Sequence, residues 1–263
     1  MRKNRLRELL NVGRPSLGTH IQIPYPGIVE LIGHSGVFDY VEIVLEYMPW
    51  DLQLLEHFGR AVEIFPDLSA MAKIEQGLRV SLASRAIGAG LQNVLFSDPR
   101  TVEDVRECVR AVRPETPEDG GVHGVSVNRS VGYFTEAGSA ALVKSLQDTV
   151  VAIMIEKKTA VENLEELLSI KGVDMVQFGP ADYAMSIGLA GQWNHPDVRK
   201  AEQLVIDTAL NMGIAPRAEI NNPEAARKYI DMGVKHFCIG WDIRVLQDWH
   251  KKAGDEMRKI IGG

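Results

Sequence analysis

The sequence contains few cysteines and no cysteine pair at a metal-binding spacing. Among its 263 residues only Cys108 and Cys238 are cysteine, and they lie far apart in the chain. This pattern argues against a disulfide framework and against a thiolate zinc site. Two isolated thiols fit a reducing compartment, so we expect a cytoplasmic protein.

Excess positive charge and long apolar runs are also lacking. The formal net charge is -6 and the sequence pI is about 5.7, which disfavours a nucleic-acid partner. The basic N-terminal stretch has no apolar core of secretory-signal length, and no run is long enough to span a bilayer. The histidines show no HxxEH-like cluster. We therefore expect a soluble protein without a membrane or nucleic-acid partner.

Short apolar runs alternate with amphipathic stretches along the chain. This alternation is typical of parallel βα units. Eight units in 263 residues predict an α/β fold of the TIM (β/α)8 barrel type, with a doubly wound sheet as the alternative. No linker marks a boundary, so residues 1–263 are predicted to form one domain. The predicted strands span residues 17–23, 40–46, 68–74, 91–97, 149–156, 173–179, 214–220 and 236–242.

The segments between these strands show helical patterns. Over residues 102–112, valines recur at helical spacing. Asn222 followed by Pro223 predicts the start of another helix. Residues 114–134 interrupt the repeat with Pro, Gly and acidic residues. They predict a long loop, which is either functional or disordered.

Two acidic residues close consecutive predicted strands. Glu156 ends the fifth strand, and Asp182 follows the sixth in the segment GPAD. In a barrel the C-terminal ends of the strands form the rim that carries the active site. Two carboxylates on this rim suit Mg²⁺ or Mn²⁺, which prefer oxygen ligands. From spacing alone, a helix-capping or surface role for either acid is the alternative.

The most specific stretch of the sequence is IEKKTAVENLEELLSIKGVDMVQFGPADYAMSIGLAGQWNHPDV. With flanking segments over most of the chain, it resembles the metal-dependent class II pyruvate aldolases of the HpcH/HpaI type, relatives of 2-keto-3-deoxy-acid aldolases. The resemblance implies a carbon–carbon lyase that acts on a 4-hydroxy-2-oxo acid through a pyruvate enolate, with an aldehyde as the second partner. It also implies Mg²⁺, Mn²⁺ or Co²⁺ as the cofactor, with Glu156 and Asp182 as its protein ligands.

The resemblance assigns substrate binding to the turn after the sixth strand. There, beside Gly179, the backbone N–H groups of Ala181 and Asp182 would receive the substrate carboxylate. A strand-to-helix turn suits this task because its free N–H groups face an anion. The oxo acid would chelate the metal ion, which acts as a Lewis acid on the enolate.

The sequence departs from the family pattern where protons are handled. Tyr47 stands in place of the family's histidine, and Gly88 falls near the acid that a neighbouring subunit supplies to that histidine. Because the ordinary pKa of tyrosine is near 10, Tyr47 is predicted to donate a hydrogen bond or a proton rather than act as a base. His20, alone or with Tyr47, is a candidate substitute acid/base, and a hydrogen-bonded structural histidine is the alternative.

Further differences concern charged groups. Lys73 replaces the family's arginine, which keeps positive charge near the oxo acid but loses bidentate recognition. Met154 replaces a glutamine. Arg129, in the long loop, is a candidate anion-binding group, with an exposed ion pair as the alternative. Lys157 and its neighbour could supply a Schiff-base amine, but adjacent lysines that open a helix more often face solvent.

The predicted function is therefore that of a metal-dependent aldolase. Because the histidine is missing, related metal–enolate chemistry on another oxo acid (condensation or decarboxylation) is one alternative, and a non-catalytic metabolite-binding barrel is another. The resemblance also implies a homo-oligomer, a hexamer or trimer of dimers, assembled through C-terminal helices. The segment over about 243–263 could form such a contact or pack on its own barrel, through Leu246, Trp249, Met257 and Ile260.

Overall fold

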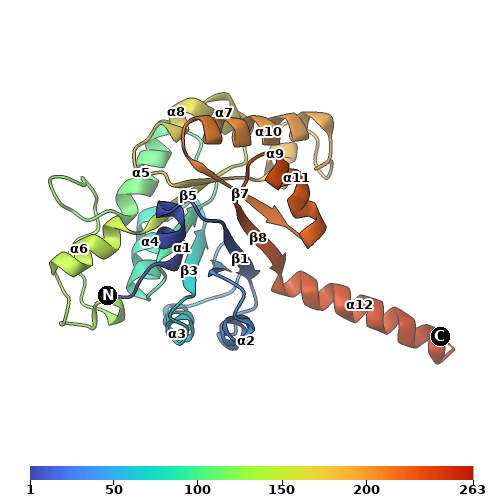
Figure 1. Cartoon of the computed structure of the whole chain (residues 1–263), viewed down its shortest axis with the longest axis horizontal. Coiled ribbons are helices and arrows are strands. Elements are labelled where there is room, and N and C mark those ends of the chain that lie inside the picture. Colours follow the sequence, from blue (N-terminus) through green and yellow to red (C-terminus); the bar gives the residue numbers. More distant parts are fainter. Residues whose placement is uncertain (263) are drawn as a thin grey trace.

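Eight parallel strands close into a barrel in the computed structural model, which describes residues 1–262 (Figure 1). The strands follow one another around the barrel in chain order, and β8 pairs with β1. This closure confirms the predicted TIM barrel and excludes a doubly wound sheet, in which the strand order reverses. The predicted strands are confirmed as β1 Ser16–Ile21, β2 Tyr40–Val44, β3 Ser69–Ile74, β4 Asn93–Phe96, β5 Val150–Ile155, β6 Met175–Phe178, β7 Ala215–Ile220 and β8 His236–Trp241.

Helices surround the barrel and connect its strands (Figure 1). Thr101 caps α5 in a reciprocal arrangement, because its hydroxyl accepts from the Asp104 N–H while the Asp104 carboxylate accepts from the Thr101 N–H. Asn222 is the N-cap residue predicted from the sequence, but the first turn after it is the 3-10 helix η2, and the α-helix α11 follows. The helices are α1 Arg5–Asn11, α2 Gly27–Ser35, α3 Leu52–Glu63, α4 Arg79–Gly88, α5 Val102–Val112, η1 Arg129–Val131, α6 Ala140–Gln147, α7 Lys158–Glu162, α8 Leu164–Leu168, α9 Pro180–Ser186, α10 Pro196–Asn211, η2 Pro223–Ala225, α11 Ala226–Asp231 and α12 Asp242–Ile260.

Alternate residues of each strand face the helices or the barrel interior. On β2, Val41 and Ile43 are buried in the main core between the barrel and its helices. Tyr40 instead belongs to a separate interior cluster, and its ring fills the space in front of Gly18. A Cβ atom at position 18 would lie 2.3 Å from that ring, so only glycine fits there.

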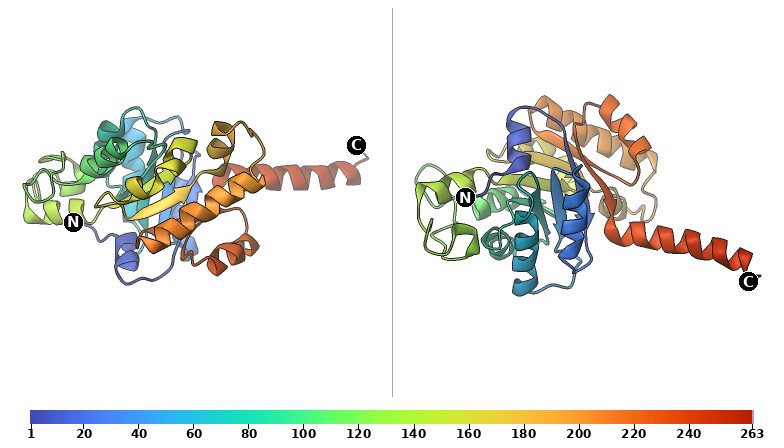
Figure 2. Two further views of the ribbon diagram at one scale, coloured as in Figure 1. Left: turned by 90° about the horizontal axis from the view of Figure 1, so that it is seen from above. Right: turned by 60° about the horizontal axis from the view of Figure 1, so that its bottom comes forward.

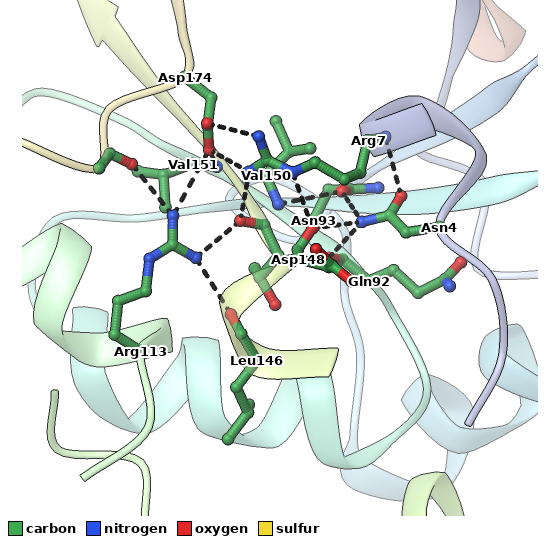
Figure 3. A network of polar contacts seen from close by, with 12 residues as sticks. Asn4, Arg7, Gln92, Asn93, Arg113, Leu146, Asp148, Val150, Val151 and Asp174 are labelled. Carbon is green, nitrogen blue, oxygen red and sulfur yellow. Dashed lines mark hydrogen bonds and ion pairs between the residues drawn. The ribbon is translucent and has the colours of Figure 1, made fainter. Parts of the chain in front are cut away.

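The N-terminal segment closes the barrel at the end where the strands begin. Leu6 of α1 is fully buried in the interior cluster. Arg7 holds Asp174, which precedes β6, through two hydrogen bonds of 2.6 and 2.7 Å (Figure 3). In the same network Arg113 donates to the Leu146 carbonyl at 3.1 Å (Figure 3). The strands finish at the opposite end of the barrel, which is the end that carries the active site in TIM barrels.

Helix α12 projects away from the barrel as a single rod (Figures 1 and 2). None of its side chains is buried. Even the apolar residues Trp249 and Ile260 are 64% and 76% exposed. The predicted helix is thus confirmed, and its outer turns do not pack on the chain's own barrel. Within residues 1–262, no helix combines the length and apolar character needed to cross a membrane.

Candidate active site

Glu156 lies directly after β5 and faces the end of the barrel where the strands finish. The residue is 6% exposed, and its carboxylate makes no hydrogen bond or ion pair with any residue over 1–262. Burial raises the pKa of Glu156 to about 7; Lys73 offsets part of this rise, and the Asp182 and Glu46 carboxylates add to it. A buried carboxylate without a protein cation is a group that a bound cation would stabilise.

Gly179 makes room for this carboxylate. It follows β6 and is the N-cap residue of α9, and a Cβ atom there would lie 2.7 Å from both the Cβ and the Oε2 atoms of Glu156. Any larger residue would therefore displace the Glu156 side chain. This close approach explains in physical terms why a glycine starts the GPAD turn.

Asp182 occupies the first turn of α9, so both predicted metal ligands lie on the same rim. Its Oδ1 atom accepts a hydrogen bond of 2.6 Å from the Nζ atom of Lys157. The Asp182 side chain is 42% exposed, and no hydrogen bond is made by its Oδ2 atom to the described residues. Lys157 thus binds this carboxylate and does not stand alone as a buried amine, which disfavours the Schiff-base alternative.

The N–H groups of Ala181 and Asp182 lie in the first turn of the same helix. Helix N–H groups at these positions have no intrahelical acceptor. Gly179, the N-cap residue, has no side chain to accept from them. The turn thus keeps donors free beside the two carboxylates, as an anion-binding role requires, and that role stays a prediction.

Lys73 and Tyr47 lie together on the part of the rim formed by β2 and β3. The Lys73 ammonium forms an ion pair of 2.6 Å with Glu46 and lies 3.4 Å from the Tyr47 hydroxyl. Burial alone would lower the pKa of Lys73, but Glu46 and Tyr47 outweigh burial and raise it above its usual value. Burial has the opposite effect on Tyr47 and raises its pKa, and the nearby charge of Lys73 offsets this rise only in part. Lys73 therefore keeps its charge and Tyr47 its proton near neutral pH.

His20 lies deeper, on β1, and only 3% of it is exposed. Its Nδ1 atom is 3.0 Å from the Gly240 carbonyl, and its Nε2 atom is 3.2 Å from Glu42. Its ring also packs against Trp241, with 5.4 Å between ring centroids. Trp241 in turn stacks on Tyr47 at 6.3 Å. His20 is therefore connected to the rim through an aromatic neighbour, and its ring does not line the open mouth.

The charged partners of His20 were not predicted from the sequence. Glu42 on β2 is fully buried and pairs closely with Arg217 on β7, whose Nε atom donates to the Tyr40 hydroxyl at 2.8 Å. Glu219, two residues after Arg217, lies 3.7 Å from His20. A signal was present, because VEIVL places one charge inside an apolar strand and APRAEI places two charges at alternate positions.

Arg129 lies at the other end of the barrel and does not join the site. Its guanidinium donates to the Ala89 carbonyl at 2.6 Å and pairs with Glu63 at 2.5 Å. Ala89 and Glu63 lie at the C-terminal ends of α4 and α3, which in a βα barrel adjoin the start of the next strand. Arg129 thus forms an ion pair, as its alternative predicted, but its side chain is 9% exposed and is therefore largely buried, which the exposed pair of that alternative was not. Gly88 adjoins the same loop, because a Cβ atom there would meet Asn128 at 2.8 Å.

Comparison with known proteins identifies the family. The profile of the HpcH/HpaI aldolase/citrate lyase family matches residues 61–247. A 4-hydroxy-2-oxo-heptane-1,7-dioate aldolase of Escherichia coli is 27% identical over 93% of this chain and 91% of its own. A hydroxypyruvate/pyruvate aldolase of Cupriavidus necator is 27% identical over 97% of this chain and 93% of its own.

The fold agrees with this assignment. A crystal structure of an HpcH/HpaI aldolase/citrate lyase family protein from Burkholderia cenocepacia superimposes with a TM-score of 0.88 at 25% identity, over 97% of this chain and all of that one. The protein therefore belongs to the HpcH/HpaI aldolase/citrate lyase family and is a carbon–carbon lyase by class. The family resemblance and the enzyme class predicted from the sequence are confirmed.

Proposed function

We propose that this protein is a divalent-metal-dependent aldolase that cleaves or forms the C3–C4 bond of a 4-hydroxy-2-oxo acid through a pyruvate enolate. One observation carries the proposal: Glu156 and Asp182 follow two consecutive barrel strands on the same rim, and Glu156 is buried without a protein cation. The names of the E. coli and C. necator relatives support an oxo acid and an aldehyde as the small-molecule partners.

The donor set fits the proposed metal. Glu156 and Asp182 would hold Mg²⁺, Mn²⁺ or Co²⁺ because carboxylate oxygens are hard ligands that leave positions for water and substrate. The space in front of Gly179 leaves the Glu156 carboxylate unobstructed, and the hydrogen bond from Lys157 occupies only one oxygen of Asp182. When bound, the ion supplies Lewis-acid stabilisation for negative charge on the substrate oxygen.

The chain's own residues supply the remaining tasks. The free N–H groups of Ala181 and Asp182 bind the substrate carboxylate. Lys73 places a fixed positive charge near the oxo group, because Glu46 keeps the ammonium protonated. Tyr47 keeps its proton and donates a hydrogen bond to a developing oxyanion.

Proton exchange at C3 of pyruvate tests the proposal directly. The expected result is metal-dependent incorporation of deuterium from D₂O into the pyruvate methyl group, lost on addition of a chelator and restored by Mn²⁺. Glu156→Gln should lose the exchange as well, because the amide is a weaker ligand. Exchange that continues unchanged in the chelator-treated protein contradicts the proposal.

A second reaction on the same site is condensation onto a keto acid, or decarboxylation. The observation that favours it is the Tyr47 side chain, whose raised pKa makes it a hydrogen-bond donor and a poor base for the aldol hydroxyl. Substrate profiling separates the two: turnover of another oxo acid, with no cleavage of any 4-hydroxy-2-oxo acid, selects this reaction.

We further propose that α12 joins copies of this chain into a homo-oligomer, a hexamer or a trimer of dimers. The helix carries exposed apolar residues along a segment that projects from the barrel. A second copy of the chain would cover that surface and shield it from water.

A further inference from the structure

Glu219 is an exposed carboxylate on an inward-facing position of the barrel. On β7, Ala218 and Ile220 pack in a cluster with Ile206, on the helix side of the sheet. The alternation of strand side chains therefore directs Arg217 and Glu219 to the interior. Arg217 is buried, but the Glu219 side chain is 38% exposed, because Glu219 is the next-to-last residue of β7 and lies at the end of the barrel where the strands finish.

Hydrogen bonds fix the orientation of this carboxylate. The Gln177 side chain accepts from Arg217 through its Oε1 atom, so its Nε2 atom must point the other way. That Nε2 atom donates to Oε2 of Glu219 at 3.1 Å. The other oxygen of Glu219 makes no hydrogen bond to a described residue and is free to meet a ligand in the mouth.

The protonation of His20 follows from its neighbours. A carbonyl oxygen only accepts, so the Nδ1 atom of His20, 3.0 Å from the Gly240 carbonyl, carries a proton. The Nε2 atom then faces two carboxylates, Oε1 of Glu42 at 3.2 Å and Oε2 of Glu219 at 3.7 Å. An unprotonated nitrogen would direct a lone pair at both of them. A proton on Nε2 removes this repulsion and faces the otherwise unpartnered Oε1 atom of Glu42, so the geometry favours an imidazolium with a proton on each nitrogen.

The charges around His20 support this state. Burial by itself would lower the pKa of His20, but interactions with Cys238, Glu42 and Glu219 outweigh burial and raise it well above its usual value. Glu42 stays ionised because Arg217 binds its second oxygen. Glu42 thus faces two cations, Arg217 and the His20 imidazolium.

A metal ion in the same cluster is the rival explanation. Donor atoms of His20, Glu42 and Cys238 lie within 4.8 Å of one another, and all three residues are buried. The Arg217 guanidinium already binds Glu42, however, so a divalent ion would lie beside a fixed positive charge. The imidazolium accounts for the same contacts without an additional cation.

The cluster adjoins the proposed substrate site. His20 packs against Trp241, and Trp241 stacks on Tyr47, which contacts Lys73. Glu219 itself lies near the C-terminal end of β7, the neighbour of β6, so its carboxylate is on the same rim as the groups proposed to bind the oxo acid. It is a base at the rim of a site whose tyrosine cannot serve as one.

We propose that Glu219 is the catalytic group that moves the proton in this reaction, and that His20 is the residue that positions it and stabilises its charge. This inference rests on the proposed aldolase function. In cleavage, Glu219 takes the proton of the 4-hydroxyl group as the C3–C4 bond breaks and the aldehyde carbonyl forms. The electron pair of that bond becomes the enolate, and C3 then receives the proton from Glu219 to give pyruvate. One proton moves from oxygen to carbon, and no other reactant is needed.

Three variants test the role of Glu219. Glu219→Gln should slow deuterium exchange at pyruvate C3 by about 10²-fold or more, while Mn²⁺ binding by titration stays unchanged. Glu219→Ala should regain part of the exchange when formate is added, because formate replaces the missing carboxylate. Glu224→Gln, on the exposed turn after β7, is the matched control and should exchange at the wild-type rate.

The positioning role of His20 has a spectroscopic signature. In ¹⁵N spectra at about pH 8, where an ordinary histidine is neutral, both ring nitrogens of His20 should carry protons. His20→Asn should lower the exchange rate, and in combination with Glu219→Gln should add nothing further, because the two residues act as one unit. A single protonated nitrogen in His20 would overturn the positioning role.

The results of these experiments distinguish a failure of the Glu219 role from a failure of the proposed aldolase function. If Glu219→Gln exchanges at the wild-type rate and formate does not increase the exchange by Glu219→Ala, the role of Glu219 is overturned and the aldolase proposal stands. A wild-type protein that exchanges no proton with any 2-oxo acid overturns both. A second equivalent of metal bound through a thiolate would overturn the imidazolium and favour the rival explanation.

Discussion

The ammonium group of Lys73 lies 3.4 Å from the hydroxyl of Tyr47 and 4.6 Å from the centre of its ring. Through this contact a cation at the end of β3 holds a tyrosine from the turn after β2. Glu46 completes the group with a 2.6 Å ion pair to Lys73. The arrangement keeps a positive charge and a phenol proton side by side on the rim.

Replacement of the Tyr47 hydroxyl tests its donor role. Tyr47→Phe keeps the ring over Lys73 and removes only the hydrogen-bond donor, so kcat for oxo-acid turnover should fall by about 10²-fold with little change in thermal stability. Steady-state kinetics and a melting curve measure both. Tyr25→Phe, a change at a 64% exposed tyrosine on another loop, is the control. Equal kcat in the two variants would contradict the role.

Metal binding should depend on both rim carboxylates. Glu156→Gln and Asp182→Asn should each weaken Mn²⁺ binding by more than about tenfold, because each removes a charged oxygen ligand. Calorimetric titration of chelator-treated protein measures the affinity. Wild-type affinity in both variants would show that the ion binds elsewhere.

Lys157 provides a matched control for this site. Its ammonium holds one oxygen of Asp182 at 2.6 Å and repels a nearby cation. Lys157→Met should therefore bind Mn²⁺ at least as tightly as the wild type in the same titration. A loss of affinity like that of Asp182→Asn would mean that Lys157 orients the ligand instead of competing with the ion.

His236 should make stability depend on pH. Burial, with Lys235 and Arg217, lowers the pKa of His236 from 6.5 to about 4, and its Nδ1 atom lies 2.9 Å from the Ser16 hydroxyl. Between these pH values the unfolded chain binds a proton that the folded chain does not. Stability should therefore fall as the pH drops through this window, by about 3 kcal/mol in all.

Urea unfolding at several pH values measures this effect. His236→Gln removes the titrating group, so the variant should lose less stability on acidification than the wild type. His57→Gln, on an exposed position of α3, is the control and should keep the wild-type slope. Identical slopes for His236→Gln and the wild type would contradict the prediction.

The exposed face of α12 should govern the oligomeric state. Trp249→Glu places a charge among apolar residues that a second copy would cover, so it should convert an assembly into smaller species. Light scattering after size exclusion measures the mass. Lys252→Glu, a charge change on the same helix, is the control. A wild-type protein that is monomeric would contradict the proposed assembly.

The sequence by itself determined the strand positions and hence the barrel. Period and spacing located each strand, because alternating apolar runs have few other ways to be buried. The sequence also placed Glu156 and Asp182 on one rim, since consecutive parallel strands of a barrel are neighbours. The replacement of the family's histidine by Tyr47 was equally visible in the linear order of residues.

Only the tertiary structure decided which charged groups meet. His20 and the Gly240 carbonyl are 220 residues apart in the chain. Glu42 of β2 contacts Arg217 of β7 only because the closed barrel brings both side chains into its interior. The position of Arg129 also depends on the tertiary structure. It lies at the end of the barrel where the strands begin, because its partners Glu63 and Ala89 lie at the C-terminal ends of α3 and α4. Local patterns fix which side chains point inward, whereas the identity of their partners depends on closure of the sheet.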